Sequence, residues 1–275
     1  MKTFYNFDEP IFNQDHLRID YEYIVGSQFL IFHLRNGLKH AANVSGFFSP
    51  MSSFDDFLKE MRLREIVTVF LNIHPTDYSS DFAAEAMETA ASLSLCDLSK
   101  PLVLAQLGKS IRQKLKSSVH LSVEESSSTE FFSIYKQQEF YSKKFMDTSL
   151  NHSSSRVIWF KVGKSEDKKA IASFGLGDGV AEYLLAASSP AARSLQAKLL
   201  IEAMVYLREK GFELLNLGGG IKPADGLEKF KLRIGDIVRP KRELRVVVNR
   251  ERFEKFGGKA DKTFFPPYYD LGGSK

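Results

Sequence analysis

Cysteine is almost absent from this 275-residue chain, which carries only Cys96. A single cysteine allows no disulfide within the chain and no zinc site built from cysteines. Because disulfides are typical of oxidising compartments, this composition favours a reducing one, and we expect a cytoplasmic protein. With 43% hydrophobic residues, a chain of this length can bury its core without disulfides.

Long hydrophobic runs and two common motifs are also missing. No stretch approaches ~18 consecutive apolar residues, so we expect no membrane-spanning helix. The first residues, MKTFYNFDEP, do not predict a secretory signal. The chain contains neither the G-x-x-x-x-G-K-[ST] motif of nucleoside-triphosphate sites nor the G-x-S-x-G motif of serine hydrolases. Nothing in the sequence predicts a metal site or a catalytic triad.

The charge balance is mildly basic, with 38 Lys and Arg against 34 Asp and Glu, or +4 at neutral pH. This balance is compatible with an anionic ligand such as a nucleotide, CoA or tRNA, and equally with an ordinary surface. The basic run of Lys109, Arg112, Lys114 and Lys116 predicts a short helix that could contact RNA or phosphate, or simply form a solvated face.

The first hundred residues predict a strand pair, a helix, a strand and a second helix. Ser53 is a good N-cap for the first helix, with acidic residues in the first turn. The β-branched residues of EIVTVFLNI are typical of a buried strand, and the alanine-rich Phe82–Leu93 segment has helical periodicity. The expected elements are strands within Asp20–Leu34 and at Ala42–Phe48, a helix at Phe54–Leu63, a strand at Glu65–Ile73 and a helix at Phe82–Leu93.

The rest of the chain predicts a longer series of elements. Gly177-Asp178-Gly179 is a strong hairpin signal between two strands. After a short strand at Leu102–Leu107, the order is helix, strand, helix, three antiparallel strands, long helix, strand, short helix, strand. The ranges are Ser110–Lys116, Val119–Val123, Thr129–Phe145, Arg156–Val162, Lys168–Leu176, Val180–Ala187, Ala191–Lys210, Phe212–Leu217, Gly226–Ile234 and Val238–Val248. The Gly257–Lys275 tail is expected to pack across the surface.

This order differs from the regular alternation of a dinucleotide-binding fold and resembles the GNAT acyltransferase fold. The segment LLNLGGGIKPADGLEKFKLRIGD (Leu214–Asp236) resembles the Fem-like branch, which includes the peptidoglycan bridge-forming aminoacyltransferases. In that branch a strand ends in Gly-Gly, and a short helix then carries Phe-Lys, a basic residue and Gly. The matching residues here are Gly218, Gly219, Phe230, Lys231, Arg233 and Gly235.

The segments Tyr183–Gly211 and Ser110–Ser126 resemble the same family, and Gly46–Leu58 and Val69–Tyr78 resemble its first half more loosely. The resemblance implies an α+β protein with a mixed, mostly antiparallel sheet flanked by helices and two tandem GNAT-like halves. The first would be a degenerate half at 1–100, and the second a catalytic half with a C-terminal tail at 101–275.

Two departures from the family leave the donor open. The turn Ser188–Ser194 has no glycine, although ordinary GNAT phosphate loops are glycine-rich, and the chain has no sustained heptads for a coiled-coil arm. The resemblance implies a small-molecule acyl donor, either acyl-CoA or an aminoacyl donor, with tRNA as a possible partner. The acceptor would be an amine of a sugar, an amino acid or a cell-envelope precursor, which could be linked to a membrane.

Donor-binding residues are expected ahead of the long helix, where free backbone N–H groups can receive an anion. Ser188, Ser189 and Arg193 lie at this point and could cradle the donor's phosphates, or form an ordinary cap with a solvent-facing arginine. The resemblance adds Phe230 and Arg233 to the donor site.

Lys231 and Tyr183 are the expected catalytic residues. The resemblance places Lys231 near the reacting carbonyl or the donor's phosphate, where a cation would stabilise developing negative charge. The alternative is a solvated lysine. Tyr183 could face the acceptor from the third hairpin strand, or be structural.

Acceptor-binding residues are expected at the glycine run and across the cleft. Gly218 and Gly219 end a buried strand and would let a ligand approach the backbone, or form a tight turn. Asn216 and Asp225 flank them, and Asp225 also fits a helix cap. Tyr78 could close the cleft from the first half.

Convincing general bases are scarce. His74 and His120 fit a turn and a strand better than a site, and Cys96 lies outside the motifs. Direct attack in a ternary complex is therefore the expected mechanism. A tRNA-dependent aminoacyltransferase, or a non-catalytic binding protein that keeps the fold, remain alternatives.

Overall fold

The structure is a computed structural model that describes residues 18–23, 29–34, 37–43, 53–135, 156–163, 165–177, 179–220 and 225–255. The strands are β1 Arg18–Tyr23, β2 Phe29–Leu34, β3 Lys39–Asn43, β4 Thr68–Asn72, β5 Met87–Asp97, β6 Val123–Glu125, β7 Arg156–Val162, β8 Ala170–Leu176, β9 Val180–Ser188, β10 Leu214–Gly218 and β11 Ile237–Val247. The α-helices are α2 Phe54–Leu63, α3 Asp81–Glu85, α4 Lys109–Ser117, α5 Ser128–Tyr135, α7 Leu195–Glu209, α8 Gly226–Leu232 and α9 Arg250–Lys255. Three 3-10 turns are η1 Leu104–Gln106, η2 Glu166–Lys168 and η3 Pro190–Ala192.

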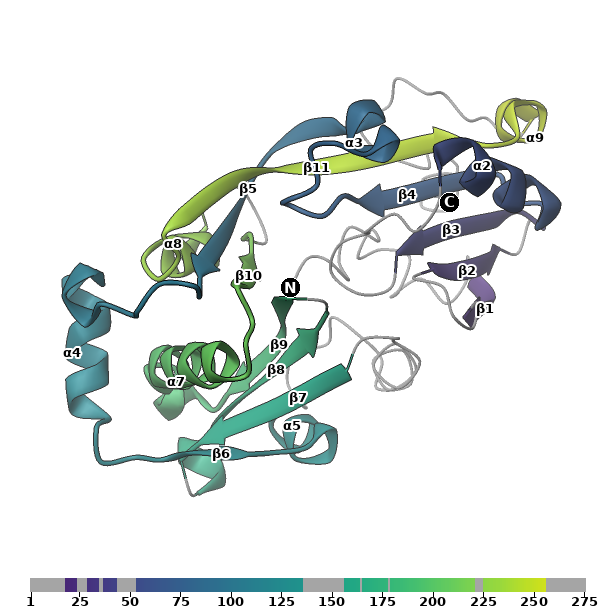
Figure 1. Ribbon diagram of the computed structural model, residues 1–275. Coiled ribbons are helices and arrows are strands. Elements are labelled where there is room, and N and C mark those ends of the chain that lie inside the picture. The colour runs from purple at the N-terminus through teal and green to yellow at the C-terminus, as the bar shows by residue number, and fades with distance from the viewer. Residues whose placement is uncertain are drawn as a thin grey trace.

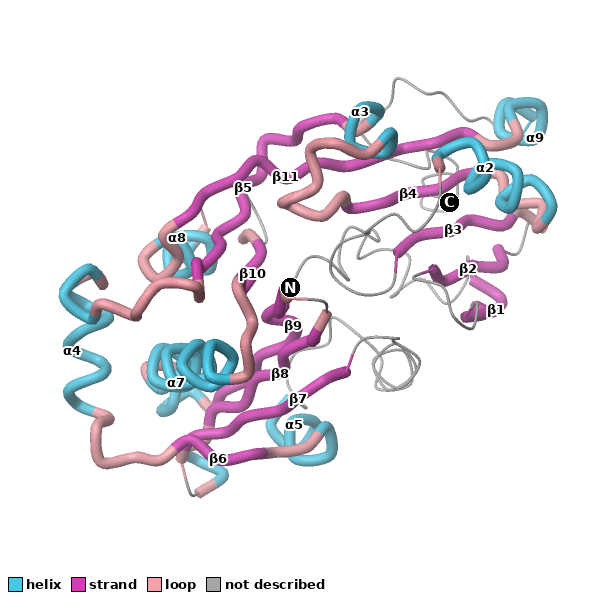
Figure 2. The backbone as a smooth tube through the Cα atoms, viewed as in Figure 1, coloured by secondary structure: helices cyan, strands magenta, loops and turns pink. Residues whose placement is uncertain are grey.

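The described strands form one curved sheet in the order β1-β2-β3-β4-β11-β5-β10-β9-β8-β7-β6 (Figure 1). The β3–β4 and β9–β10 pairs are parallel, and the other neighbouring pairs are antiparallel. Helices flank this sheet (Figure 2). The predicted fold class, a mixed and mostly antiparallel sheet flanked by helices, is confirmed.

We use "first half" for β1–β4 with α2 and α3. Its core forms where α2 and α3 pack on one face of the sheet. Ser53 caps α2 by accepting from the Asp56 backbone N–H, as the sequence predicts. Phe57 and Met61, four positions apart, point inward and meet Phe82 of α3 in the same core cluster.

We use "second half" for β6–β10 with α4, α5, α7 and α8. The long helix α7 packs on β7 and β8, and α4 packs beside it. The buried side chains of α7 include Leu199, Leu200, Ala203 and Leu207, which lie in one cluster with residues of the strands. Phe160 of β7 meets the Tyr206 ring edge to face at 5.0 Å.

Two long strands, β5 and β11, join the halves. β11 pairs with β5 from Ile237 to Glu243 and with β4 from Glu243 to Val247. β5 in turn pairs with β10. The last strand of the described residues, β11, therefore lies inside the sheet, between β4 and β5. The proposed division into 1–100 and 101–275 stays a prediction.

Three predicted elements are wrong. The strand predicted at Val119–Val123 is displaced, because residues 118–120 form a turn after α4 and β6 begins only at Val123. The Phe82–Leu93 segment is not one helix, because α3 ends at Glu85 and β5 runs from Met87. β5 lies between β10 and β11, and pairing on both sides overrides the helical propensity of its alanines. The Leu102–Leu107 strand is also wrong, since this segment contains the 3-10 turn η1.

Other predicted elements reach beyond the described residues. The helix predicted at Thr129–Phe145 is confirmed as α5 up to Tyr135, and its remainder lies outside the described part of the chain. The predicted tail at Gly257–Lys275 lies outside it as well. In the described ranges, no helix is long and apolar enough to cross a membrane.

Candidate active site

The two parallel strands β9 and β10 separate after a short paired stretch. Leu214–Asn216 pair with Val180–Glu182, but β9 continues to Ser188. Gly218 of β10 instead stays paired with Ser94 of β5. The Asn216 side chain accepts a hydrogen bond from the Gly218 backbone N–H at 2.9 Å, which fixes the turn at the end of β10. The strands thus open a gap between the end of β10 and the second part of β9.

Lys231 of α8 reaches this gap and is fully buried. Its Nζ donates to the Gly219 carbonyl oxygen at 2.8 Å and lies 5.6 Å from the centroid of the Tyr183 ring on β9. Burial lowers the pKa of Lys231 to about 8, although the nearby Asp225 carboxylate opposes this shift. At neutral pH the side chain is therefore mostly an ammonium that can also release its proton. The sequence alternative of a solvated lysine does not fit this placement.

The backbone around Lys231 is held firmly against β5. Ser94 donates from its hydroxyl to the Lys231 carbonyl oxygen at 2.9 Å. A Cβ atom at Gly235 would lie 2.1 Å from Ser94 Oγ, so only glycine allows this close approach. Asp225 caps α8 by accepting from the Glu228 backbone N–H at 2.7 Å. Asp225 therefore has the structural role that the sequence offered as an alternative.

Tyr183 is buried beside Lys231. Its hydroxyl lies 3.5 Å from Oε1 of Gln196, whose amide nitrogen donates to the Ala187 carbonyl oxygen at 2.8 Å. Burial raises the pKa of Tyr183, so the side chain stays a neutral phenol. It can donate a hydrogen bond, but the raised pKa makes it poorly suited to release its proton.

The structure requires glycine at both positions that end β10, for a different reason at each. Gly218 has φ of +72°, a left-handed conformation that side chains disfavour. At Gly219 a Cβ atom would lie 2.6 Å from the Ser92 carbonyl oxygen of β5. These constraints fit the tight-turn alternative, and they also position the Gly219 carbonyl that receives Lys231. Acceptor binding by Asn216, Gly218 and Gly219 stays a prediction.

The predicted donor loop connects β9 to α7. The Ser189 hydroxyl donates to the Asp167 carbonyl oxygen at 2.7 Å and accepts from the Lys169 backbone N–H at 3.3 Å. These bonds tie the loop to the β7–β8 hairpin. Arg193 is exposed and Ser188 is half-buried. Ser194, the residue before α7, forms no side-chain cap with that helix. Backbone N–H groups at the start of α7 therefore suit an anion, which keeps the donor prediction open.

Phe230 and Arg233 lie away from Lys231, on the side of α8 that faces α4. The Lys114 ammonium lies 5.7 Å from the centroid of the Phe230 ring, and Arg233 is exposed beside Gly108. Residues three positions apart share a helix face, whereas Lys231 points elsewhere. The structure therefore separates two predicted donor residues from the lysine in the same motif.

Tyr78 belongs to the loop after β4, in the first half. It is 56% exposed, and its ring centroid lies 4.3 Å from the Arg242 guanidinium. Arg242 itself is buried and bonds to the carbonyl oxygens of His74 and Asp77. Tyr78 is thus available at the surface, and its predicted acceptor role is not tested by these contacts.

The remaining candidate nucleophiles and bases fit structural roles. Burial raises the pKa of the Cys96 thiol, which makes it a poor nucleophile. Burial lowers the pKa of His74, whose Nδ1 accepts from the Thr76 backbone N–H at 3.3 Å. His120 is exposed. No group of His, Cys, Asp and Glu within the described ranges could hold a metal ion.

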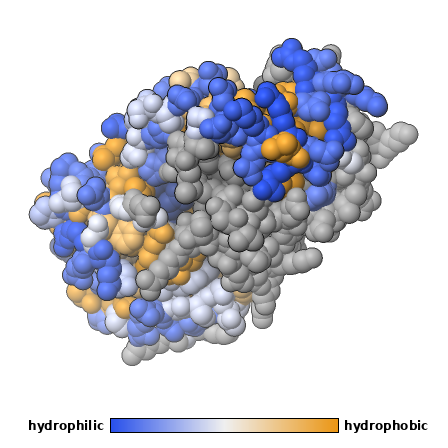
Figure 3. Space-filling model, turned by 45° about the vertical axis from the view of Figure 1, so that its right-hand side comes forward, coloured by the Kyte–Doolittle hydropathy of each residue, from blue (hydrophilic) through white to orange (hydrophobic). Residues whose placement is uncertain are grey.

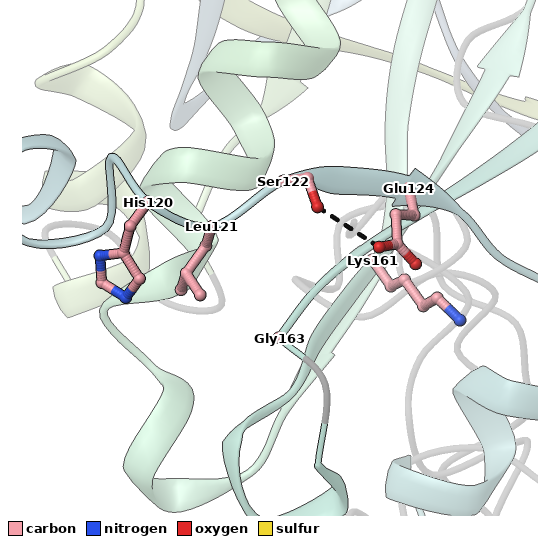
Figure 4. A pocket seen from close by; sticks show the side chains of 6 residues that line it. All are labelled: His120, Leu121, Ser122, Glu124, Lys161 and Gly163. Carbon is pink, nitrogen blue, oxygen red and sulfur yellow. Dashed lines mark hydrogen bonds between the residues drawn. The ribbon is translucent and has the colours of Figure 1, made fainter.

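A small hollow lies apart from these residues, at the β6–β7 edge of the sheet (Figure 4). Ser122 and Glu124 bond across it at 3.3 Å. Lys161 also lines it, but its ammonium pairs with Glu130 of α5 at 3.0 Å. The hollow's lining is His120, Leu121, Ser122, Glu124, Lys161 and Gly163. None of the predicted site residues lines it.

Sequence reasoning missed Gln196 and Ser94. Ser94 donates to the Lys231 backbone at 2.9 Å across 137 positions of the chain, and Gln196 lies 3.5 Å from Tyr183, which is 13 positions away. Ser94 lay next to the segment mistaken for a helix. Gln196 had a weak local signal, because it lies one residue into the helix after the predicted donor loop.

Comparisons with known proteins support the fold. The chain matches no protein-family model and no curated protein. Among solved structures it is similar to FemX, with a TM-score of 0.56 and 12% identity over 93% of this chain and 94% of that one. It is also similar to L-PGS from Bacillus licheniformis (TM-score 0.53, 14% identity, 84% of each chain). A third is the C-terminal DUF2156 domain of a protein from Agrobacterium fabrum (TM-score 0.50, 18% identity, 85% of each chain). The chain therefore shares its fold with FemX, and the Fem-like fold that the sequence resemblance predicted is confirmed.

Proposed function

We propose that this protein is an N-acyltransferase of the Fem-like kind. It would move an acyl group from acyl-CoA, or from an aminoacyl donor, to an amine of a sugar, an amino acid or a cell-envelope precursor. The observation that carries the proposal is the buried Lys231 ammonium in the gap between β9 and β10. Strongly shifted pKa values concentrate at functional sites, which supports a chemical role for this lysine.

The chemistry needs a cation where the carbonyl oxygen gains charge. The acceptor nitrogen attacks the donor's carbonyl carbon, and the oxygen becomes an oxyanion that the Lys231 ammonium would stabilise. The intermediate then collapses, and the C–S bond of a thioester, or the C–O bond of an aminoacyl ester, breaks. The leaving group takes up one proton while the amine nitrogen releases one. With a pKa of about 8, Lys231 can give the first proton and recover the second.

The neighbouring residues support direct transfer. Tyr183 stays protonated and can hydrogen-bond to a reacting group. The buried Cys96, with its raised pKa, does not favour a covalent acyl-enzyme. The uncapped start of α7 and the exposed Arg193 would receive the phosphates of the donor.

A thermal-shift screen tests the proposal and separates the donors. The protein is heated with acetyl-CoA, longer acyl-CoAs, free CoA and aminoacylated tRNA. A ligand at ~100 times its dissociation constant adds about 2.7 kcal/mol of stability. A shift with acyl-CoA that Arg193→Ala weakens supports the thioester donor. A shift with tRNA alone supports the aminoacyl donor. No shift with any of them contradicts the enzyme and favours a binding protein that keeps the fold.

A further inference from the structure

The ionised side chains of the α4 region are all basic, and the proposed reaction does not use them. Between Asp97 and Glu124 the chain has no acidic residue, but it has five basic ones: Lys100, Lys109, Arg112, Lys114 and Lys116. Lys100 pairs with Asp97 at 2.6 Å, and Lys114 lies over the Phe230 ring. Lys109 and Lys116 are exposed on α4.

Aliphatic side chains are exposed on both sides of these lysines. Val103 and Leu104, just before α4, are 45% and 51% exposed, and Val119, just after it, is 74% exposed. The second-half core is filled by other residues of this region, since Leu107 and Ile111 are buried in it. The exposed Val and Leu side chains therefore have no part in that core. On the face of the molecule that Figure 3 shows, hydrophobic residues are exposed among hydrophilic ones.

The fold holds the charged and aliphatic residues beside one another. With 3.6 residues per turn, Lys109, Gln113 and Lys116 share the face of α4 opposite the buried Ile111. The Arg112 guanidinium donates to the carbonyl oxygens of Ala105 and Leu107 at 2.6 and 2.9 Å. These bonds hold the turn η1 against α4. α4 lies at the left-hand end of the molecule, outside the sheet (Figures 1 and 2).

We propose that this α4 surface (Val103, Leu104, Lys109, Lys116 and Val119) docks on an anionic lipid membrane. Lysines beside exposed aliphatic side chains are typical of segments that lie in a membrane interface, where the lysines meet acidic headgroups. Single-stranded nucleic acid is more often bound by stacking on aromatic side chains, and none of these five residues is aromatic. The neighbouring α8 adds exposed Lys229 and Arg233, which extend the positive surface. The contact would hold the protein against a membrane.

Vesicle co-sedimentation tests the docking. The full chain is mixed with vesicles of phosphatidylcholine alone or with added phosphatidylglycerol. We expect binding only with the anionic lipid, and weaker binding as salt is raised. Each lysine near such a surface strengthens binding on the order of fivefold, so Lys109→Gln with Lys116→Gln is expected to weaken it about 25-fold. Equal binding to both vesicle types, or no binding, overturns the proposal.

A second set of variants distinguishes docking by the α4 surface from non-specific vesicle binding through exposed apolar side chains. Val103→Ser with Leu104→Ser is expected to weaken vesicle binding severalfold, whereas Leu63→Ser should not change it. Leu63 is 86% exposed but lies on α2, in the first half. Circular dichroism confirms that each variant is folded. If Leu63→Ser weakens binding as much as the α4 pair, or if the protein binds tRNA but not vesicles, the proposal is wrong.

Discussion

Lys231 and Gly219 are joined by a buried hydrogen bond of 2.8 Å from Nζ to the carbonyl oxygen. This bond ties α8 to the end of β10, while the Tyr183 ring borders the same ammonium from β9. The cation therefore lies between the two strands at the point where they separate. A change at either strand end is expected to move or expose this charge, and the predictions below use that dependence.

The stability of the protein is expected to rise between pH 8 and pH 10.5, and Lys231→Met is expected to remove part of this rise. The pKa of Lys231 is about 8 in the folded chain and near its ordinary value of 10.5 when unfolded. Between these values the unfolded chain binds more protons, so stability increases with pH. The expected gain is on the order of 3 kcal/mol at most. Urea unfolding at pH 7.5 and pH 10 measures it. Equal pH dependence in wild type, Lys231→Met and the exposed control Lys229→Met would contradict the burial of this charge.

Tyr183→Phe and Tyr183→Leu are expected to have different effects. Phenylalanine keeps the ring beside Lys231 and removes only a hydroxyl with a long 3.5 Å contact to Gln196. Its free energy of unfolding should stay within about 1 kcal/mol of wild type. Leucine removes the aromatic ring and should cost about 1–3 kcal/mol more. Turnover of the two variants shows whether the hydroxyl acts in transfer. Equal stability of both variants would mean that the ring does not support the lysine.

Gly219→Ala is expected to destabilise the protein by about 1–3 kcal/mol. The new methyl group would lie 2.6 Å from the Ser92 carbonyl oxygen, so the backbone of β10 or β5 must shift. That shift would also displace the carbonyl that receives Lys231. Gly226→Ala is the control, because Gly226 starts α8 with no atom within 4 Å of the added group. Thermal unfolding of the two variants checks this. A neutral Gly219→Ala would show that the strands do not approach as closely as described.

Glu130→Gln is expected to reduce stability at neutral pH but not at very low pH. Lys169, at 2.6 Å, chiefly holds the pKa of Glu130 at about 2, with help from Lys161 and Ser126. A carboxylate with a lowered pKa stabilises the fold above its ordinary pKa of 4.5, and this contribution is lost as the pH falls toward 2. Because the group is partly exposed, we expect about 1 kcal/mol. The free energy of unfolding is measured as the pH is lowered, for Glu130→Gln and for Glu124→Gln, an exposed control on β6. Parallel acid curves for wild type and Glu130→Gln would reject this network.

Local signals in the sequence predicted much of the fold. Ser53 and the acidic first turn predicted α2 with its bounds, and the Gly177–Gly179 turn predicted the β8–β9 hairpin. β5 was mistaken for a helix because its alanines favour helices, while its strand state depends on partners more than a hundred positions away. The position of β11 between β4 and β5 has the same cause.

The resemblance singled out Lys231 as a catalytic residue, which stays a prediction, and it said nothing of the surroundings of this lysine. The resemblance identified Lys231, yet its burial depends on how β9 and β10 separate, which no local pattern encodes. The same motif grouped Phe230 and Arg233 with Lys231, although helix geometry turns them toward α4. Ser94 could not be found because its partner Lys231 lies 137 positions away. Gln196 could not be found because its contacts with Tyr183 and Ala187 depend on where α7 is placed relative to β9.

The most direct test of the central claim is the acyl-transfer rate of Lys231→Met, compared with Lys229→Met on the same helix. The donor is whichever ligand the thermal-shift screen selects, tried with a panel of amines. If the buried ammonium stabilises the oxyanion, Lys231→Met should lower kcat by about 100- to 1,000-fold while the donor still binds. Lys229→Met should keep the wild-type rate. A folded Lys231→Met protein that transfers the acyl group at the wild-type rate would contradict the claim.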